Sequence, residues 1–254
     1  MLKKVFAHRG ASAYAPENTL PAFEKAVQMG ADGVELDIHL SRDGQLVVIH
    51  DELLDRTTNG HGFVKDFTLA ELKKLDASKP RASLGFNKLE IPTLEEVYAL
   101  LADTALCVNV EVKNSIFLYH GILEKALEAE AKAGMSGRVL YSSFNHYAMR
   151  EMKRISPQSE TGLLYSSMLI EPWNAAKNAN ADALHPFFPS VANTPDLISE
   201  CRKNGIAVNT WTVDEPEYIR AMLMLGVDSV ITNKPDVAVL IRNELAGRTR
   251  SAEK

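Results

Sequence analysis

The chain has 254 residues, of which 46% are hydrophobic and 24% charged, and its formal net charge is −5. This composition is typical of a folded domain that buries a large core, and the acidic balance excludes non-specific binding to nucleic acid or to an anionic membrane. The sequence has neither a signal-peptide pattern nor the roughly 20 apolar residues of a membrane span. We therefore expect a cytoplasmic protein without a stable membrane anchor. The sequence does not indicate an oligomeric state.

Short strand-like runs alternate with longer helical patterns along the chain. Strands are expected at 5–7, 33–40, 46–50, 105–112, 138–142, 161–165, 181–184, 206–211 and 227–232. Helices are expected at 19–27, 93–101, 116–133, 146–155, 173–178, 194–203, 215–225 and 235–245. This alternation predicts a parallel sheet, and roughly eight strand–helix units at this length favour a closed (β/α)₈ TIM barrel, an α/β fold. We expect residues 1–246 to form one domain and 247–254 a flexible tail.

One segment, residues 51–90, interrupts the alternation. It follows a predicted strand and contains Gly60, Gly62, Pro80 and Gly85, which are typical of loops. We interpret it as an insertion in a strand-to-helix connection after the second strand of the barrel. In barrels, such connections form the face that carries the active site.

Two predicted strands carry ionisable residues at every second position. In the first, Glu35, Asp37 and His39 alternate with apolar residues, and in the second Glu111 and Lys113 do so. Alternation is common where one face of an antiparallel sheet meets water, but in a barrel the ionisable face would point inward. Buried carboxylates need a partner, and a divalent cation such as Mg²⁺ or Ca²⁺ suits three oxygen ligands. The pattern predicts a metal site formed by Glu35, Asp37 and Glu111.

Two histidines, His8 and His50, end predicted strands and would lie at the carboxyl edge of the barrel. A single histidine there is usually explained by a structural hydrogen bond, but a pair beside carboxylates can serve as general acid and general base. Arg9 offers a planar fork that suits a phosphate, and Lys113 adds a second positive charge. This combination favours a small-molecule phosphate ester as the substrate.

These residues belong to a longer series of short motifs. In chain order they are His8-Arg9-Gly10, Pro16-Glu17-Asn18-Thr19, residues 30–37, Arg42-Asp43-Gly44, His50-Asp51, residues 56–60, Ile91-Pro92-Thr93-Leu94, Glu111-Val112-Lys113 and Trp211-Thr212-Val213-Asp214. The series closely resembles the glycerophosphodiester phosphodiesterase family, and most of all its bacterial cytoplasmic type. The resemblance extends from His8 to about Pro235.

The resemblance implies a barrel that hydrolyses glycerophosphodiesters to an alcohol and sn-glycerol 3-phosphate. It implies a divalent cation on Glu35, Asp37 and Glu111, acid–base catalysis by His8 and His50, phosphate binding by Arg9 and Lys113, and contact of Trp211 with glycerol. In one departure, Asn233 stands where the family usually has Asp after the last strand. Because Asn can cap a helix, we expect Asn233 to have only a structural role at the start of the final helix.

Several residues have more than one interpretation from the sequence alone. Glu17 and Asn18 could support Arg9 or the bound phosphate, or could only shape the turn before the first helix. His39 could touch metal or substrate, or could support residues that do. His185 could line the substrate site or pack in the core. At the level of function, the alternatives are a lysophospholipase D-like phosphodiesterase and a catalytically inactive barrel that acts as a binding protein.

Overall fold

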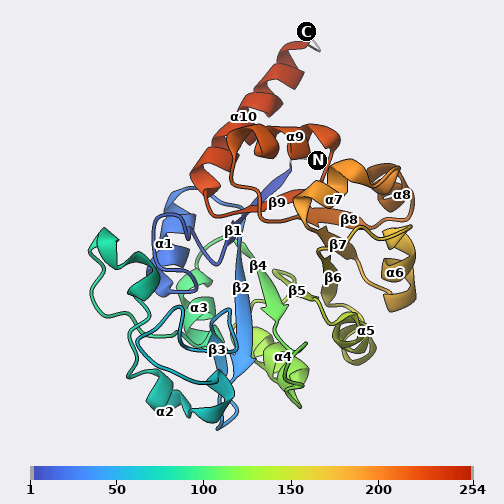
Figure 1. Ribbon diagram of the computed structural model, residues 1–254. Helices are drawn as coiled ribbons and strands as arrows, with labels where there is room; N and C mark the ends of the chain where they lie inside the picture. The colour runs from blue at the N-terminus through green and yellow to red at the C-terminus, as the bar shows by residue number, and fades with distance from the viewer. Residues whose placement is uncertain (1–2, 253–254) are drawn as a thin grey trace.

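The computed structural model describes residues 3–252, except for the side chains of residues 80–82 and 248–252. Within this range, parallel strands close into a barrel (Figure 1). They are β1 (Lys4–His8), β2 (Gly33–Leu40), β4 (Cys107–Val112), β5 (Val139–Ser143), β6 (Glu160–Tyr165), β7 (Ala183–Pro186), β8 (Ala207–Thr210) and β9 (Ser229–Thr232). The barrel closes because β1 pairs with both β2 and β9. The predicted (β/α)₈ fold is therefore confirmed.

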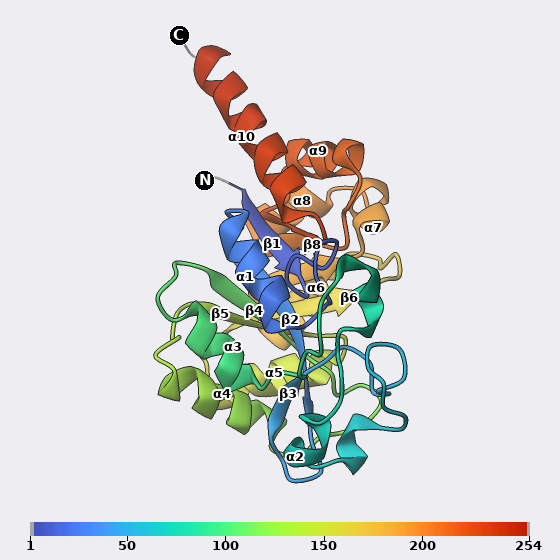
Figure 2. The same cartoon turned by 90° about the vertical axis from the view of Figure 1, so that its left-hand side faces the viewer.

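Helices cover the outside of the barrel, and α1, α3 and α4 lie side by side in Figure 2. The helices are α1 (Leu20–Gln28), α3 (Leu94–Leu101), α4 (Ile122–Lys132), α5 (His146–Ile155), α6 (Pro172–Ala179), α7 (Phe188–Asn193), α8 (Leu197–Lys203), α9 (Pro216–Leu225) and α10 (Pro235–Ala252). Their apolar faces share one core with the outward side chains of the strands, such as Leu36 and Ile38. Burial of each such side chain contributes about 1.5–3 kcal/mol. The opposite face of β2 therefore points into the barrel.

The strand predicted at 46–50 does not belong to the barrel. It forms β3 (Leu46–Val48), which pairs antiparallel with the end of β2. The segment 51–90 follows it and contains η1 (Val64–Asp66), α2 (Leu69–Leu72) and η2 (Lys79–Leu84). In Figure 1 this insertion lies beside β3, at the lower left. Its apolar side chains form a separate small cluster with residues of β3 and of the flanking chain: Val47, Ile49, Leu54, Val64, Leu72, Ala77 and Ile91.

Two predicted helices begin later than their sequences suggested. The helix predicted at 116–133 starts only at Ile122, because Gly121 has a φ of 78° and interrupts the helical backbone. The helix predicted to start at Thr194 is α8, and it starts only at Leu197. The residue before it, Asp196, has a φ of 59° and is not helical. The short helix α7 precedes it, and Thr194 ends α7.

The last helix extends beyond its predicted end at 245. Helix α10 continues to Ala252, because Gly247 keeps a helical backbone instead of the left-handed conformation that often ends helices. Residues 247–252 of the predicted tail are therefore helical, and 253–254 lie outside the described residues. Figures 1 and 2 both show α10 projecting away from the barrel. No helix within residues 3–252 is long and apolar enough to cross a membrane.

Candidate active site

Three acidic side chains meet inside the barrel on the neighbouring strands β2 and β4. Asp37 is opposite Glu111 in the strand pairing, and Glu35 lies one pleat before Asp37. One carboxylate oxygen from each residue lies within 4.8 Å of the others. All three side chains are buried. The structure thus brings together the three residues that the sequence predicted as metal ligands.

Two cations partly compensate the charge of this cluster. Lys113 Nζ lies 2.8 Å from Glu111 Oε1 and 3.7 Å from Asp37 Oδ1. Arg9 Nε lies 3.6 Å from Asp37 Oδ2, and the Arg9 backbone N–H donates to Glu35 Oε2 at 2.9 Å. Three carboxylates against two cations leave a net negative charge. Asp37 Oδ1 is also buried without a hydrogen bond.

The pKa values of the carboxyl groups reflect this balance. Burial raises the pKa of Glu35 well above its ordinary value, and the nearby Asp37 and Glu111 carboxylates raise it further. Burial also raises the pKa of Glu111, against the opposing effect of Lys113. Burial alone would raise the pKa of Asp37, but His50, Lys113 and Arg9 outweigh it and hold that pKa below its usual range. An incompletely compensated, buried set of oxygen ligands could hold a metal ion.

His8 ends β1 beside this cluster. Its Nε2 lies 4.0 Å from Glu35 Oε2, and its Nδ1 lies 2.7 Å from Asn233 Oδ1. Burial, together with the charge of Arg9, lowers the pKa of His8 to about 4. The expectation that Asn233 only caps the last helix is wrong. Helix α10 begins at Pro235, two residues later, and the Asn233 side chain contacts His8 and Asp214 instead.

His50 reaches the site by a different route from the one predicted. It follows the antiparallel β3, which returns along β2 toward the acidic cluster. Its Nδ1 donates to Asp51 Oδ1 at 2.6 Å, and its Nε2 lies 3.2 Å from Lys113 Nζ. His39 Nε2 donates to the backbone oxygen of His50 at 3.1 Å, and His39 Nδ1 contacts the Tyr119 hydroxyl. His39 thus supports His50 in this structure.

The backbone around Arg9 is held in a tight turn. Arg9 has a φ of 53°, and Gly10, at 76°, lies so close to α1 that a Cβ there would be 2.6 Å from the backbone of Ala22. Arg9 Nη1 donates to Glu17 Oε1 at 2.7 Å. Asn18 Nδ2 donates to Asp37 Oδ2 at 2.8 Å. Glu17 therefore contacts Arg9, and Asn18 contacts Asp37 in the acidic cluster.

Arg56 and Asp51, both from the insertion, hydrogen-bond to residues of the site. Neither was assigned a role from the sequence. Arg56 donates to both oxygens of Glu17 and to both oxygens of Asp51. Glu17 contacts Arg9, and Asp51 contacts His50. Arg56 thus connects the supports of two predicted site residues. Its place in the motif at 56–60 was the only signal in the sequence.

A small cavity of about 50 Å³ opens among these groups. It is lined by His8, Arg9, Glu35, His50, Asn109, Glu111, Phe144, Leu164, Trp211 and Ile231. Trp211 is fixed by its Nε1–H, which donates to the His185 backbone oxygen at 2.7 Å, and by an edge contact with Phe144. The His185 side chain is fully buried and pairs with Asn209 Nδ2. It packs inside the barrel, as the packing alternative expected.

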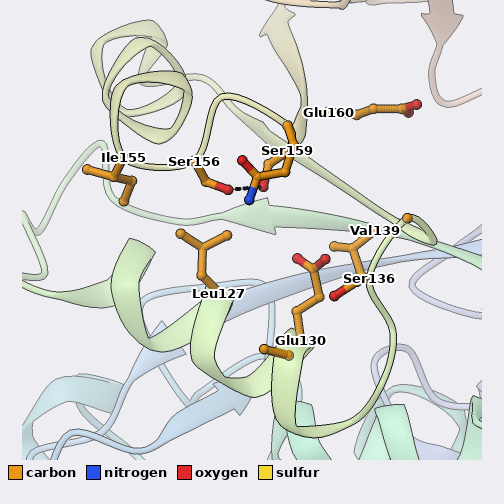
Figure 3. A pocket seen from close by; sticks show the side chains of 11 residues that line it. Leu127, Glu130, Ser136, Val139, Ile155, Ser156, Ser159 and Glu160 are labelled. Carbon is orange, nitrogen blue, oxygen red and sulfur yellow. Dashed lines mark hydrogen bonds between the residues drawn. The ribbon is translucent and has the colours of Figure 1, made fainter.

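A larger cavity, of about 420 Å³, lies elsewhere (Figure 3). Its lining includes Val139 and Glu160, which begin β5 and β6, and Glu130 from α4. It therefore opens at the amino ends of the strands, whereas barrel enzymes carry their chemistry at the carboxyl ends. Its size alone does not make it the active site.

Comparisons with known proteins agree with this geometry. The model of the glycerophosphoryl diester phosphodiesterase family matches residues 8–237. A glycerophosphodiester phosphodiesterase of Caldanaerobacter subterraneus subsp. tengcongensis is 48% identical over 92% of this chain and 96% of its own. The crystal structure of a glycerophosphodiester phosphodiesterase from Agrobacterium tumefaciens superposes with a TM-score of 0.81, at 30% identity over 93% of this chain and 99% of that chain.

A phosphodiesterase of Oleispira antarctica was solved in complex with the product sn-glycerol-3-phosphate. It superposes with a TM-score of 0.83, at 29% identity over 95% of this chain and 97% of that chain. The family match covers most of the chain and includes the carboxylates, the histidines and Arg9. The protein is an enzyme, and it belongs to the glycerophosphoryl diester phosphodiesterase family.

Proposed function

We propose that this enzyme hydrolyses glycerophosphodiesters, in a metal-dependent reaction, to an alcohol and sn-glycerol 3-phosphate. One observation carries the proposal: His8, Arg9, His50 and two of the three clustered carboxylates line the same cavity. The product complex of the Oleispira antarctica phosphodiesterase supports this product for the present chain.

The metal would be held by Glu35, Asp37 and Glu111. The chemistry of these oxygen donors fits a hard divalent cation, Mg²⁺ or Ca²⁺. The incompletely compensated negative charge and the buried Asp37 Oδ1, which accepts no hydrogen bond, support its presence. When bound, the cation would supply positive charge for the non-bridging oxygens of the phosphodiester. Arg9 and Lys113, which lie beside the cluster, would bind the same phosphate.

His8 and His50 would transfer protons on either side of the phosphate. The resemblance favours the glycerol 2-hydroxyl as the nucleophile, whose oxygen attacks phosphorus while one histidine accepts its proton. The bond from phosphorus to the leaving alcohol breaks, and the other histidine protonates the departing oxygen. Water then opens the cyclic phosphate, with the two proton transfers reversed. Trp211 would pack against the glycerol carbons during both steps.

Phosphorus NMR of a reaction with glycerophosphocholine tests the proposal. Breaking the bond to choline gives glycerol 3-phosphate, whereas breaking the bond to glycerol gives phosphocholine. We expect only the first product, and only with a divalent cation present. Release of phosphocholine would contradict the assigned direction of attack.

One observation favours a second candidate, a lysophospholipase D-like activity. The loops after β4 and β6 expose apolar side chains that an acyl chain could contact: Ile116 and Leu118 are 67% and 69% exposed, and Met168 and Ile170 are 63% and 95% exposed. Parallel assays of glycerophosphoethanolamine and lysophosphatidylcholine separate the two candidates. Faster turnover of the acylated substrate would support the second.

A further inference from the structure

Asn233 lies between a catalytic histidine candidate and a carboxylate. Its Oδ1 is 2.7 Å from His8 Nδ1, and its Nδ2 donates to Asp214 Oδ2 at 2.6 Å. The Asn233 backbone N–H donates to Asp214 Oδ1 at 2.8 Å. Thr232 Oγ1 donates to the same oxygen at 3.0 Å. Asp214 follows β8, whereas Asn233 follows β9, so the contacts link the ends of two neighbouring strands to β1.

Hydrogen-bonding capacity fixes the orientation of the Asn233 amide. The oxygens of an ionised carboxylate only accept hydrogen bonds, so the amide NH₂ must face Asp214. The opposite orientation would place two acceptor oxygens 2.6 Å apart. The Asn233 Oδ1 therefore faces His8, and Ser12 Oγ donates to it as well, at 2.6 Å.

An amide oxygen facing His8 Nδ1 requires that Nδ1 carries a hydrogen. In neutral His8, Nε2 then has the free lone pair; His8 lines the cavity, and its Nε2 lies 4.0 Å from Glu35 Oε2. We propose that Asn233 and Asp214 are positioning residues that hold His8 in this tautomer, which makes His8 the acceptor of the proton from the attacking oxygen. This inference rests on the proposed function and deepens it.

The surroundings of His50 argue against His50 as the acceptor of that proton. His50 also donates from Nδ1, to Asp51, but its Nε2 faces the Lys113 ammonium group at 3.2 Å. An ammonium group only donates, so the lone pair of His50 Nε2 is already used in this structure. His8 Nε2, in contrast, lies 4.0 Å from Glu35 Oε2, which is too far for a hydrogen bond.

The inference predicts a specific rescue. Asn233→Leu removes the acceptor for His8 Nδ1, and Asn233→Asp places a carboxylate against Asp214; each should lower kcat about 10–100-fold with little change in KM. Combining Asn233→Asp with Asp214→Asn exchanges the two groups and again leaves an oxygen facing His8. The combined variant should recover kcat to within about threefold of the wild type. Asn174→Leu is the matched control, because it removes a similar contact between Asn174 on α6 and Glu171 just before that helix.

Nitrogen NMR of the histidine side chains gives a readout that a merely structural role would not move. In the wild type we expect neutral His8 to carry its hydrogen on Nδ1, and in Asn233→Leu we expect a mixture of tautomers. A wild-type His8 with its hydrogen on Nε2, or a normal kcat in Asn233→Leu, would overturn the inference. Absence of hydrolysis by the wild type would instead contradict the proposed function, while the NMR result would still decide the tautomer. If Asn233→Leu does not fold, the kcat of the combined Asn233→Asp and Asp214→Asn variant and the wild-type spectrum still test the inference.

Discussion

Asp37 on β2 and Glu111 on β4 lie directly opposite each other in parallel strands. Because side chains of a strand alternate between faces, Glu35, two residues before Asp37 on β2, lies on the same face as Asp37. The three carboxylates are thus fixed by strand backbone and not by flexible loops, which allows a site to form before the metal binds.

Loss of either facing carboxylate should abolish metal binding. We expect Asp37→Asn and Glu111→Gln each to lose stoichiometric binding of Mg²⁺ or Ca²⁺ in calorimetry, and to lose nearly all hydrolysis, because two ligands remain. Glu128→Gln, an exposed change on α4, is the matched control and should behave as the wild type. Unchanged affinity in Asp37→Asn would remove this residue from the metal site.

In the metal-free protein, the contribution of Glu35 to the free energy of unfolding should fall as pH rises. The pKa of Glu35 is raised by burial and by Asp37 and Glu111 above its ordinary 4.5, so above that pH the folded state binds more protons than the unfolded state. This contribution to stability is present below pH 4.5 and is lost as pH rises through the raised pKa. Comparing wild type with Glu35→Gln in chelator isolates it from other groups.

Denaturant unfolding of the two proteins measures this effect. We expect the stability of Glu35→Gln relative to the wild type to increase as the pH rises above 4.5 and through the raised pKa of Glu35. With saturating metal the wild type should instead be the more stable protein, because the metal stabilises only the protein that has all three ligands. A stability difference that does not change with pH would show that Glu35 is not held in a raised-pKa environment.

Both histidines should be required for turnover but not for folding. We expect His8→Ala and His50→Ala each to lower kcat by roughly 10²–10⁴ while the thermal transition is retained. The exposed His120 provides the control, since His120→Ala should leave kcat unchanged. Near-normal turnover in either site variant would remove that histidine from the mechanism.

Arg56 should matter although it lies outside the cavity. Arg56→Ala leaves Glu17 and Asp51 without their shared partner, so Arg9 and His50 lose orientation, and we expect kcat to fall about 10–100-fold. Arg42→Ala also removes an arginine that pairs with an insertion carboxylate, Glu71, and should have little effect. Equal kinetics for the two variants would show that the Arg56 network does not support the site.

Local periodicity explains what the sequence could predict. Alternation along 33–40 and 107–112 is a property of each strand alone, and it correctly indicated that Glu35, Asp37 and Glu111 share a face. The barrel followed from the same kind of local signal repeated along the chain. Gly121 was harder to interpret, because the residues before it have helical composition and only its backbone conformation ends the pattern.

Contacts between distant residues could not be predicted in this way. His50 approaches the cluster because β3 folds back on β2, and antiparallel pairing of so short a segment has no clear signal in the sequence. The His8–Asn233 contact joins residues 225 positions apart. The departure at Asn233 from the Asp that is usual in the family was visible in the sequence, but its contacts with His8 and Asp214 were not.

We propose above all that a divalent cation on Glu35, Asp37 and Glu111 is needed to form sn-glycerol 3-phosphate. The most direct measurement is the release of sn-glycerol 3-phosphate from glycerophosphocholine by metal-stripped protein, before and after addition of Mg²⁺ or Ca²⁺. We expect no release from the stripped protein and restored release after addition in the wild type, but not in Glu111→Gln. Undiminished release from protein verified to be free of metal would contradict the account.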